Sequence, residues 1–167
     1  MTEAEWNSCD DTQKMLVFLR TSCVRTDRKS RLFGANCVQW LRNSVEAPAG
    51  RGAVGVAKAA AGRISEDEIR RVLFPCALGM AAQVAFLRDV YGPLPFRSVI
   101  VAPSWRTSAV VAMATAIYND RDFVVMPVLA DALEEAGCGD PEILGHLRQG
   151  QGHVRGCWAL DLGLGKE

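Results

Sequence analysis

Both histidines of the chain lie close to two of its cysteines in the C-terminal part of the sequence. The four side chains follow the pattern Cys-x7-His-x6-His-x3-Cys, as Cys138, His146, His153 and Cys157. Zinc binds thiolate and imidazole groups tetrahedrally, so this set could form a structural zinc site. The pattern lacks the paired short intervals of a zinc finger. The alternative is that the cysteines are small buried hydrophobic residues and the histidines are polar surface or turn residues.

A cysteine nucleophile is a further hypothesis for the same segment. His153 and Cys157 are four residues apart, and Asp161 follows one turn later, so a helix would present all three on one face. Such a row on a rigid helix offers no evident cleft for a substrate. The alternative is a structural helix whose Asp161 pairs with an arginine. We therefore assign no catalytic residues and lean against an enzyme.

Charge is segregated along the chain, although 19 basic and 19 acidic residues give a formal net charge of zero. Six basic residues and one acid lie between Arg20 and Arg42, whereas seven acids and one base lie between Asp120 and Glu142. These segments either pair inside the molecule or present opposite faces to a partner protein. The residues that we expect at such an interface are Arg28, Lys29, Arg31, Asp131, Glu134 and Glu135. A zero net charge argues against a general nucleic-acid or acidic-membrane binder.

Length and composition indicate one globular domain. The chain has 167 residues, of which 49% are hydrophobic and 23% charged, and this length can bury a core without disulfides or metals. We expect a single domain over residues 1–167, with a weak internal boundary in the loop at 44–53 as the alternative. The acidic N-terminal twenty residues do not resemble a secretory signal, and the longest uncharged run, 72–87, is shorter than the roughly 20 residues of a membrane span. Six cysteines without an export signal predict reduced thiols and a cytoplasmic protein.

Capping residues and apolar periodicity predict mostly helices. Thr2 with Glu5 forms a capping box, and Asp11 and Asp27 begin the next two helices, the second running to about Arg42. Later helices are expected at 75–90, 107–118, 127–136, 140–148 and 153–162, with a short one at 54–61. In the helix at 127–136 the predicted inward positions are Val128, Leu129, Ala132, Leu133 and Ala136.

One segment should not be helical. Residues 93–105 contain three prolines and an apolar run, which predicts an extended crossover between helices. The expected fold is mainly α, a single domain of about seven to nine short helices joined in part by this crossover.

Several short strings of this sequence resemble strings found in a known protein family. They are TEAEW at 2–6, MLVFLR at 15–20, DRKSRLF at 27–33, MPVLADALEEAGC at 126–138 and HVRGCWALDLGLGK at 153–166. In these strings the chain resembles an uncharacterised planctomycete-type protein family. Members of that family often carry a cysteine cluster after the Arg-Leu-Phe string, where this chain has Cys37 alone. Because the family has no assigned activity, the resemblance implies neither substrate nor cofactor.

The sequence favours a non-enzymatic protein-interaction or adaptor domain that contacts another protein. It predicts no cofactor, no specific nucleic acid and no membrane partner. A small zinc-binding domain that uses the C-terminal cysteines and histidines is the second hypothesis, and a cysteine-dependent enzyme is the third.

Overall fold

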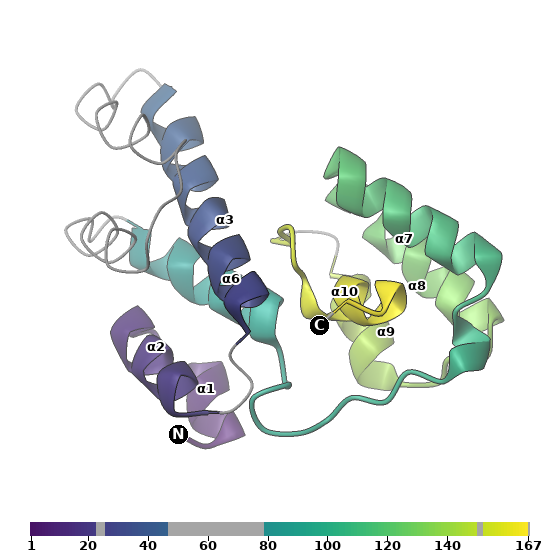
Figure 1. Ribbon diagram of the computed structural model, residues 1–167, viewed down its shortest axis with the longest axis horizontal. Helices are drawn as coiled ribbons and strands as arrows, with labels where there is room; N and C mark the ends of the chain where they lie inside the picture. The colour runs from purple at the N-terminus through teal and green to yellow at the C-terminus, as the bar shows by residue number, and fades with distance from the viewer. Residues whose placement is uncertain (23–25, 47–78, 150–151, 167) are drawn as a thin grey trace.

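Helices account for most of the chain in the computed structural model, which describes residues 1–22, 26–46, 79–149 and 152–166. These ranges contain eight α-helices, two short 3-10 helices and no β-strand. The predicted mainly α class is therefore confirmed. The helices form two groups, each with its own buried hydrophobic cluster (Figure 1).

The first group contains the helices α1 (Glu3–Ser8), α2 (Thr12–Thr21), α3 (Asp27–Glu46) and α6 (Met80–Tyr91). Thr2 forms the predicted capping box at α1, and the Asp11 carboxylate caps α2 by accepting from the N–H groups of Gln13 and Lys14. These caps satisfy N–H groups that the first turn of each helix would otherwise leave unpaired. Helices α2 and α3 both contact α6. The buried side chains of this core are Trp6, Met15, Leu19, Phe33, Cys37, Val84, Leu87, Val90 and Tyr91.

The second group contains the helices α7 (Ser108–Asp120), α8 (Met126–Glu135), α9 (Pro141–Leu147) and α10 (Trp158–Leu164). A 3-10 turn, η3 (Phe123–Val125), leads into α8. The Thr107 side chain caps α7 and Asp140 caps α9, as the sequence predicts for Asp140. Helices α7, α8, α9 and α10 contact one another around a core that includes Leu129, Leu133 and Leu147.

A non-helical crossover joins the two groups. Residues 92–107 run as turns and extended chain, interrupted by the 3-10 turn η2 (Pro103–Trp105), along one side of the molecule (Figure 1). The predicted crossover at 93–105 is thereby confirmed, but its extended part is confined to 98–102, because turns precede it and a 3-10 turn follows it. The groups also touch directly, because α10 contacts α6.

The last helix begins later than the sequence suggests. We expected a helix from His153, but α10 starts at Trp158, and His153 to Cys157 form a turn-containing approach to it. Gly156 in this approach has φ +95°, which is incompatible with a continuous α-helix. A Cβ at Gly156 would also lie 2.8 Å from Leu32 Cδ1 of α3, so the chain passes close to the first group here.

Two further helix predictions need correction. Helix α3 is capped by Thr26, whose Oγ1 accepts from the Lys29 N–H at 3.2 Å, and it continues to Glu46 instead of ending near Arg42. In α8 the predicted inward residue Val128 is 53% exposed, and the buried positions are Met126, Leu129, Ala130 and Leu133. The face buried by α8 is thus rotated, because the helix packs against α7 and α9 together.

Some sequence predictions fall on residues 47–78, outside the described ranges. These are most of the loop at 44–53, the helix at 54–61 and the first residues of the helix expected from Pro75. No helix in the described ranges has both the length and the apolar character needed to cross a membrane.

Candidate metal centre

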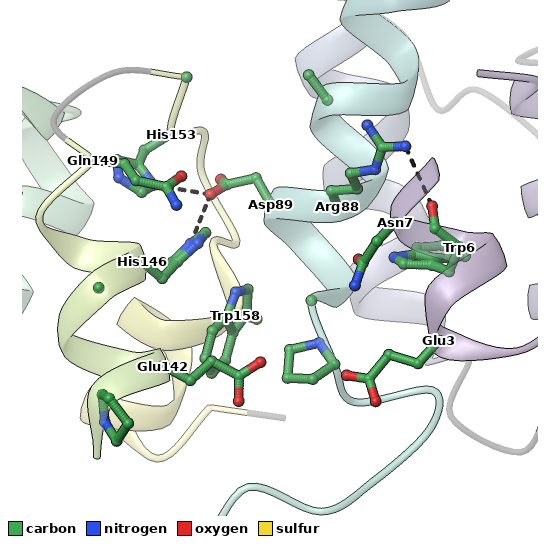
Figure 2. A pocket seen from close by; sticks show the side chains of 16 residues that line it. Glu3, Trp6, Asn7, Arg88, Asp89, Glu142, His146, Gln149, His153 and Trp158 are labelled. Carbon is green, nitrogen blue, oxygen red and sulfur yellow. Dashed lines mark hydrogen bonds and ion pairs between the residues drawn. The ribbon is translucent and has the colours of Figure 1, made fainter. Parts of the chain in front are cut away.

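Four side chains that can bind a metal ion converge where the two helix groups meet. Asp89 comes from the last turn of α6, His146 from α9, and His153 and Cys157 from the segment that leads into α10 (Figure 2). Each offers one ligand atom, and all four atoms lie within 4.8 Å of one another. The first helix group supplies one of these ligands, and the second supplies three.

Local structure places each of these groups. The Asp140 carboxylate accepts from the N–H groups of Glu142 and Ile143, which begins α9 two turns before His146. Cys157 is the residue immediately before α10. The chain leaves α6 at Gly92, only three residues after Asp89.

The distances between the ligand atoms are short. The Oδ1 atom of Asp89 lies 2.9 Å from His153 Nδ1 and 3.1 Å from His146 Nε2. The Cys157 Sγ atom lies 3.2 Å from His146 Nε2 and 3.7 Å from His153 Nδ1. One carboxylate oxygen, one sulfur and two ring nitrogens therefore surround a common point.

Each ring nitrogen of the cluster faces two partners at once. His146 Nε2 faces both Asp89 Oδ1 and Cys157 Sγ, and so does His153 Nδ1. A ring nitrogen carries either one hydrogen or one lone pair, so it cannot form a well-aligned hydrogen bond with both. In the tautomers that leave these two nitrogens without hydrogens, their lone pairs meet in the arrangement that a bound cation requires.

The polar surroundings of the cluster fix Asp89 and His153 in place. Asp89 Oδ2 accepts the Val154 N–H at 2.7 Å, which leaves Oδ1 as the carboxylate atom directed at the cluster. His153 Nε2 is buried and has no hydrogen-bond partner in the described part of the chain. All described polar contacts of the His153 ring therefore pass through Nδ1.

The buried environment controls the charges of the acid and the thiol. Burial raises the pKa of the Asp89 carboxyl, but hydrogen bonds from His146 and His153 outweigh it, so the pKa lies below its ordinary value. Burial raises the pKa of the Cys157 thiol well above its ordinary value, and the Asp89 charge adds to this effect. Asp89 is thus an anion and Cys157 a neutral thiol until a cation is bound.

A cavity of about 560 Å³ opens beside the cluster. Asp89, His146 and His153 line it, together with residues of α1, α6 and α9 and the indole of Trp158 (Figure 2). The His146 ring packs against Trp158, with 5.0 Å between the ring centroids. One wall of the cavity thereby supports a potential metal ligand.

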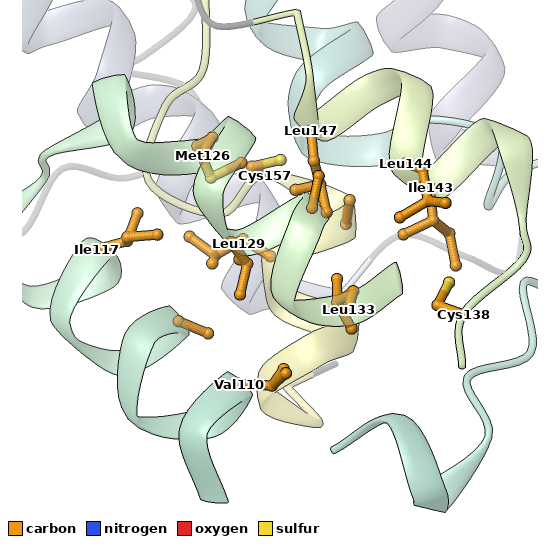
Figure 3. Close-up of a cluster of buried hydrophobic side chains, with 14 of the residues drawn as sticks. Val110, Ile117, Met126, Leu129, Leu133, Cys138, Ile143, Leu144, Leu147 and Cys157 are labelled. Carbon is orange, nitrogen blue, oxygen red and sulfur yellow. The ribbon is translucent and has the colours of Figure 1, made fainter. Parts of the chain in front are cut away.

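The structure brings together three of the four residues predicted as metal ligands. Cys138 is not part of the cluster: both cysteines belong to the same hydrophobic core, but Cys138 lies at its other end, beside Ile143 and Leu144 (Figure 3). Asp89 takes the fourth position, and it was not among the residues predicted from the sequence. One signal could have found it: an acid in the last turn of a helix opposes the helix dipole, which suggests a compensating partner.

The arrangement does not match that of a cysteine nucleophile. Asp161 pairs with Arg28, as the structural alternative predicted, and it does not orient His153. His153 faces both Cys157 and Asp89 through the same atom, Nδ1, whereas a catalytic triad uses both ring nitrogens. The thiol is fully buried and protonated.

The six residues predicted at a protein interface divide into inward-facing and exposed ones. Lys29 is buried, with its Nζ donating to the Val90 carbonyl at 2.6 Å, and Arg28 binds Asp161. The exposed ones are Arg31, Asp131, Glu134 and Glu135. Asp131 and Glu134 both accept hydrogen bonds from Arg148. Among these described contacts the basic and acidic segments do not pair with each other.

No known family pattern, curated protein sequence or solved structure matches this chain. The resemblance to the planctomycete-type family therefore stays a prediction. The geometry of the cluster carries the functional argument by itself.

Proposed function

We propose that the protein binds one zinc ion through Asp89, His146, His153 and Cys157, and that the ion fastens the two helix groups together. The observation that carries this proposal is the convergence of four donor atoms from three separate segments, with four of the pairs at 2.9–3.7 Å.

The donor set suits zinc. A thiolate, two imidazoles and a carboxylate oxygen are all zinc ligands, with bond lengths of about 2.0–2.3 Å. Tetrahedral bonds of that length separate the ligand atoms by about 3.3–3.7 Å. The four pairs of atoms at 2.9–3.7 Å reach this separation with shifts of a few tenths of an ångström. Hard cations such as calcium prefer a larger number of oxygen ligands and fit the set poorly.

The position of the cluster suggests what the ion does. Asp89 belongs to the helix group at the N-terminal end, while His146, His153 and Cys157 belong to the other group. An ion shared between them replaces several weak contacts with coordination bonds. Binding to the folded state alone stabilises it, by about 4 kcal/mol at a free zinc concentration of 1,000 times Kd.

Metal analysis of the purified chain tests the proposal. Elemental mass spectrometry should find about one zinc ion per chain. Removal of the zinc with a chelator should lower the melting temperature, and added zinc should restore it. The variants Asp89→Asn and Cys157→Ser should lose the zinc-dependent rise in melting temperature. A chain without bound zinc, whose melting temperature does not respond to added zinc, contradicts the proposal.

Cys138 provides a matched control. It is a buried cysteine of the same hydrophobic core, but it lies outside the cluster. Cys138→Ser should destabilise the chain through lost packing and yet keep its zinc. Equal loss of zinc from Cys138→Ser and Cys157→Ser would place the ion elsewhere.

The adaptor role predicted from the charge pattern stays a prediction. Its exposed residues are Arg31, Asp131, Glu134 and Glu135. Reversal of the charges of Glu134 and Glu135 should weaken a partner's binding. Unchanged affinity in that double variant removes this surface from consideration.

A further inference from the structure

The zinc centre has one side turned toward the cavity. Asp89, His146 and His153 line the cavity, whereas Cys157 does not and is fully buried behind them. An ion held by the four groups has its Asp89–His146–His153 face directed at the cavity and its Cys157 bond directed away from it.

Asp89 does not close that face. Its Oδ2 atom is held by the Val154 N–H at 2.7 Å, so the carboxylate offers the ion only Oδ1. Zinc with four ligands can expand to five-coordinate geometry when a further donor reaches it. A further donor would therefore reach an ion held by these residues from the cavity, on the side lined by Asp89, His146 and His153.

We infer that the metal takes this additional ligand from a small organic molecule with an oxygen-donor head, such as a hydroxamate or carboxylate, and an apolar body. This inference rests on the proposed zinc site. The cavity volume of about 560 Å³ lies in the range of small-molecule sites.

The walls of the cavity fit such a ligand. Trp6, Pro93 and Trp158 supply apolar surface for the body. Arg88 also lines the cavity, and its guanidinium is held on the side of α1 by the carbonyl oxygens of Trp6 and Cys9. The carboxylates of Glu3 and Glu142, which also line it, are both paired with Arg97, so their negative charge is offset.

A larger side chain at Gly145 would fill the cavity and leave the four metal-binding residues unchanged. This glycine lies on the cavity-lining face of α9, three residues after Glu142 and four before Gln149. A Cβ at this position meets nothing within 4 Å, so a larger side chain can be introduced without a clash at its base. Gly145→Ala is the matched control, because it changes the helix propensity in the same direction and leaves the cavity open.

The test uses the full chain loaded with cobalt(II), whose visible absorption reports the coordination number. Acetohydroxamate and benzohydroxamate are the two probes, added in titrations. We expect both to shift and weaken the cobalt bands, with benzohydroxamate binding about tenfold more tightly because its ring is buried. Gly145→Phe should keep the cobalt spectrum and raise the Kd of benzohydroxamate about tenfold or more, whereas Gly145→Ala should not.

Different results would overturn the additional ligand alone or the zinc site itself. A cobalt spectrum that neither probe alters overturns the inference and leaves the four-ligand zinc site intact. Probe binding that Gly145→Phe does not weaken also overturns it, because the ligand then lies outside the cavity. Absence of any thiolate–cobalt absorption overturns the proposed zinc site and this inference with it.

Discussion

Arg28 and Asp161 form a bidentate ion pair between α3 and α10, although 133 residues separate them in the sequence. The Arg28 Nη1 atom lies 2.6 Å from Asp161 Oδ2, and Nη2 lies 2.8 Å from Oδ1. Asp161 is almost completely buried. A second positive group, Lys29 Nζ, lies 3.8 Å from its Oδ2 atom. The pair therefore joins the two helix groups at a second point, beside the metal centre.

Replacement of Asp161 should be among the most destabilising polar changes in the chain. Asp161→Asn leaves the neighbouring charges of Arg28 and Lys29 without a buried counter-ion, and we expect a loss of about 3–5 kcal/mol in the free energy of unfolding. Denaturant unfolding measures it. The control is Glu134→Gln, which removes an exposed carboxylate from Arg148 and should cost about 0–1 kcal/mol. Equal costs for both variants would show that burial of Asp161 has no energetic consequence.

The buried Lys29 should make stability depend on alkaline pH. Burial lowers the pKa of the Lys29 ammonium below its ordinary value, so the unfolded chain holds this proton more tightly than the folded chain. Stability should therefore rise with pH between the lowered pKa and about 10.4, the value in the unfolded chain. The observable is the difference in unfolding free energy between the natural chain and Lys29→Met, followed from pH 8 upward. A difference that stays constant over this range contradicts the expected titration.

Gly92 permits the close approach of α6 to Trp158. Its φ is +50°, and a Cβ there would lie 2.4 Å from Trp158 Cδ1. Gly92→Ala should cost about 2 kcal/mol or more and displace the indole that supports His146, so zinc affinity should fall as well. At Gly139 an added Cβ meets nothing within 4 Å, so Gly139→Ala should change stability by only about 0.5 kcal/mol. Thermal melting and zinc titration of both variants compare the two effects.

Two adjacent residues of α8 test which side of that helix is buried. Val128 is 53% exposed and Leu129 is 1% exposed. Val128→Lys should alter the unfolding free energy by no more than about 0.5 kcal/mol, while Leu129→Lys places a charge in the core and should cost several kcal/mol. Similar losses for both lysine variants would mean that Val128 is also buried.

Local signals in the sequence predicted the fold class and several helix starts correctly. Thr2, Asp11 and Asp140 cap helices in the structure because capping depends on hydrogen bonds within three residues. The prediction that Val128 faces inward was wrong, because the buried side of a short helix depends on which neighbours the helix packs against. No local pattern in α8 specifies α7 and α9 as those neighbours.

The metal centre was only partly predictable for the same reason. His146, His153 and Cys157 are close in the sequence, so their shared chemistry was visible there. The expected placement of His153 and Cys157 on one helix was wrong, because Gly156 interrupts it, yet Cys157 still lies beside both histidines. Asp89 lies 64 residues before His153, and only the tertiary contact between the helix groups brings it to the site.

The crossover at 92–107 links Asp89 to the part of the chain that carries His146, His153 and Cys157. It leaves α6 just after Asp89 and ends where the helix group with the other three ligands begins. Its length and its prolines thus set the effective concentration at which the carboxylate meets the three remaining donors. A chain with a longer and more flexible crossover would keep every ligand and still bind zinc more weakly. The zinc affinity would then report the fraction of molecules in which the two helix groups are in contact.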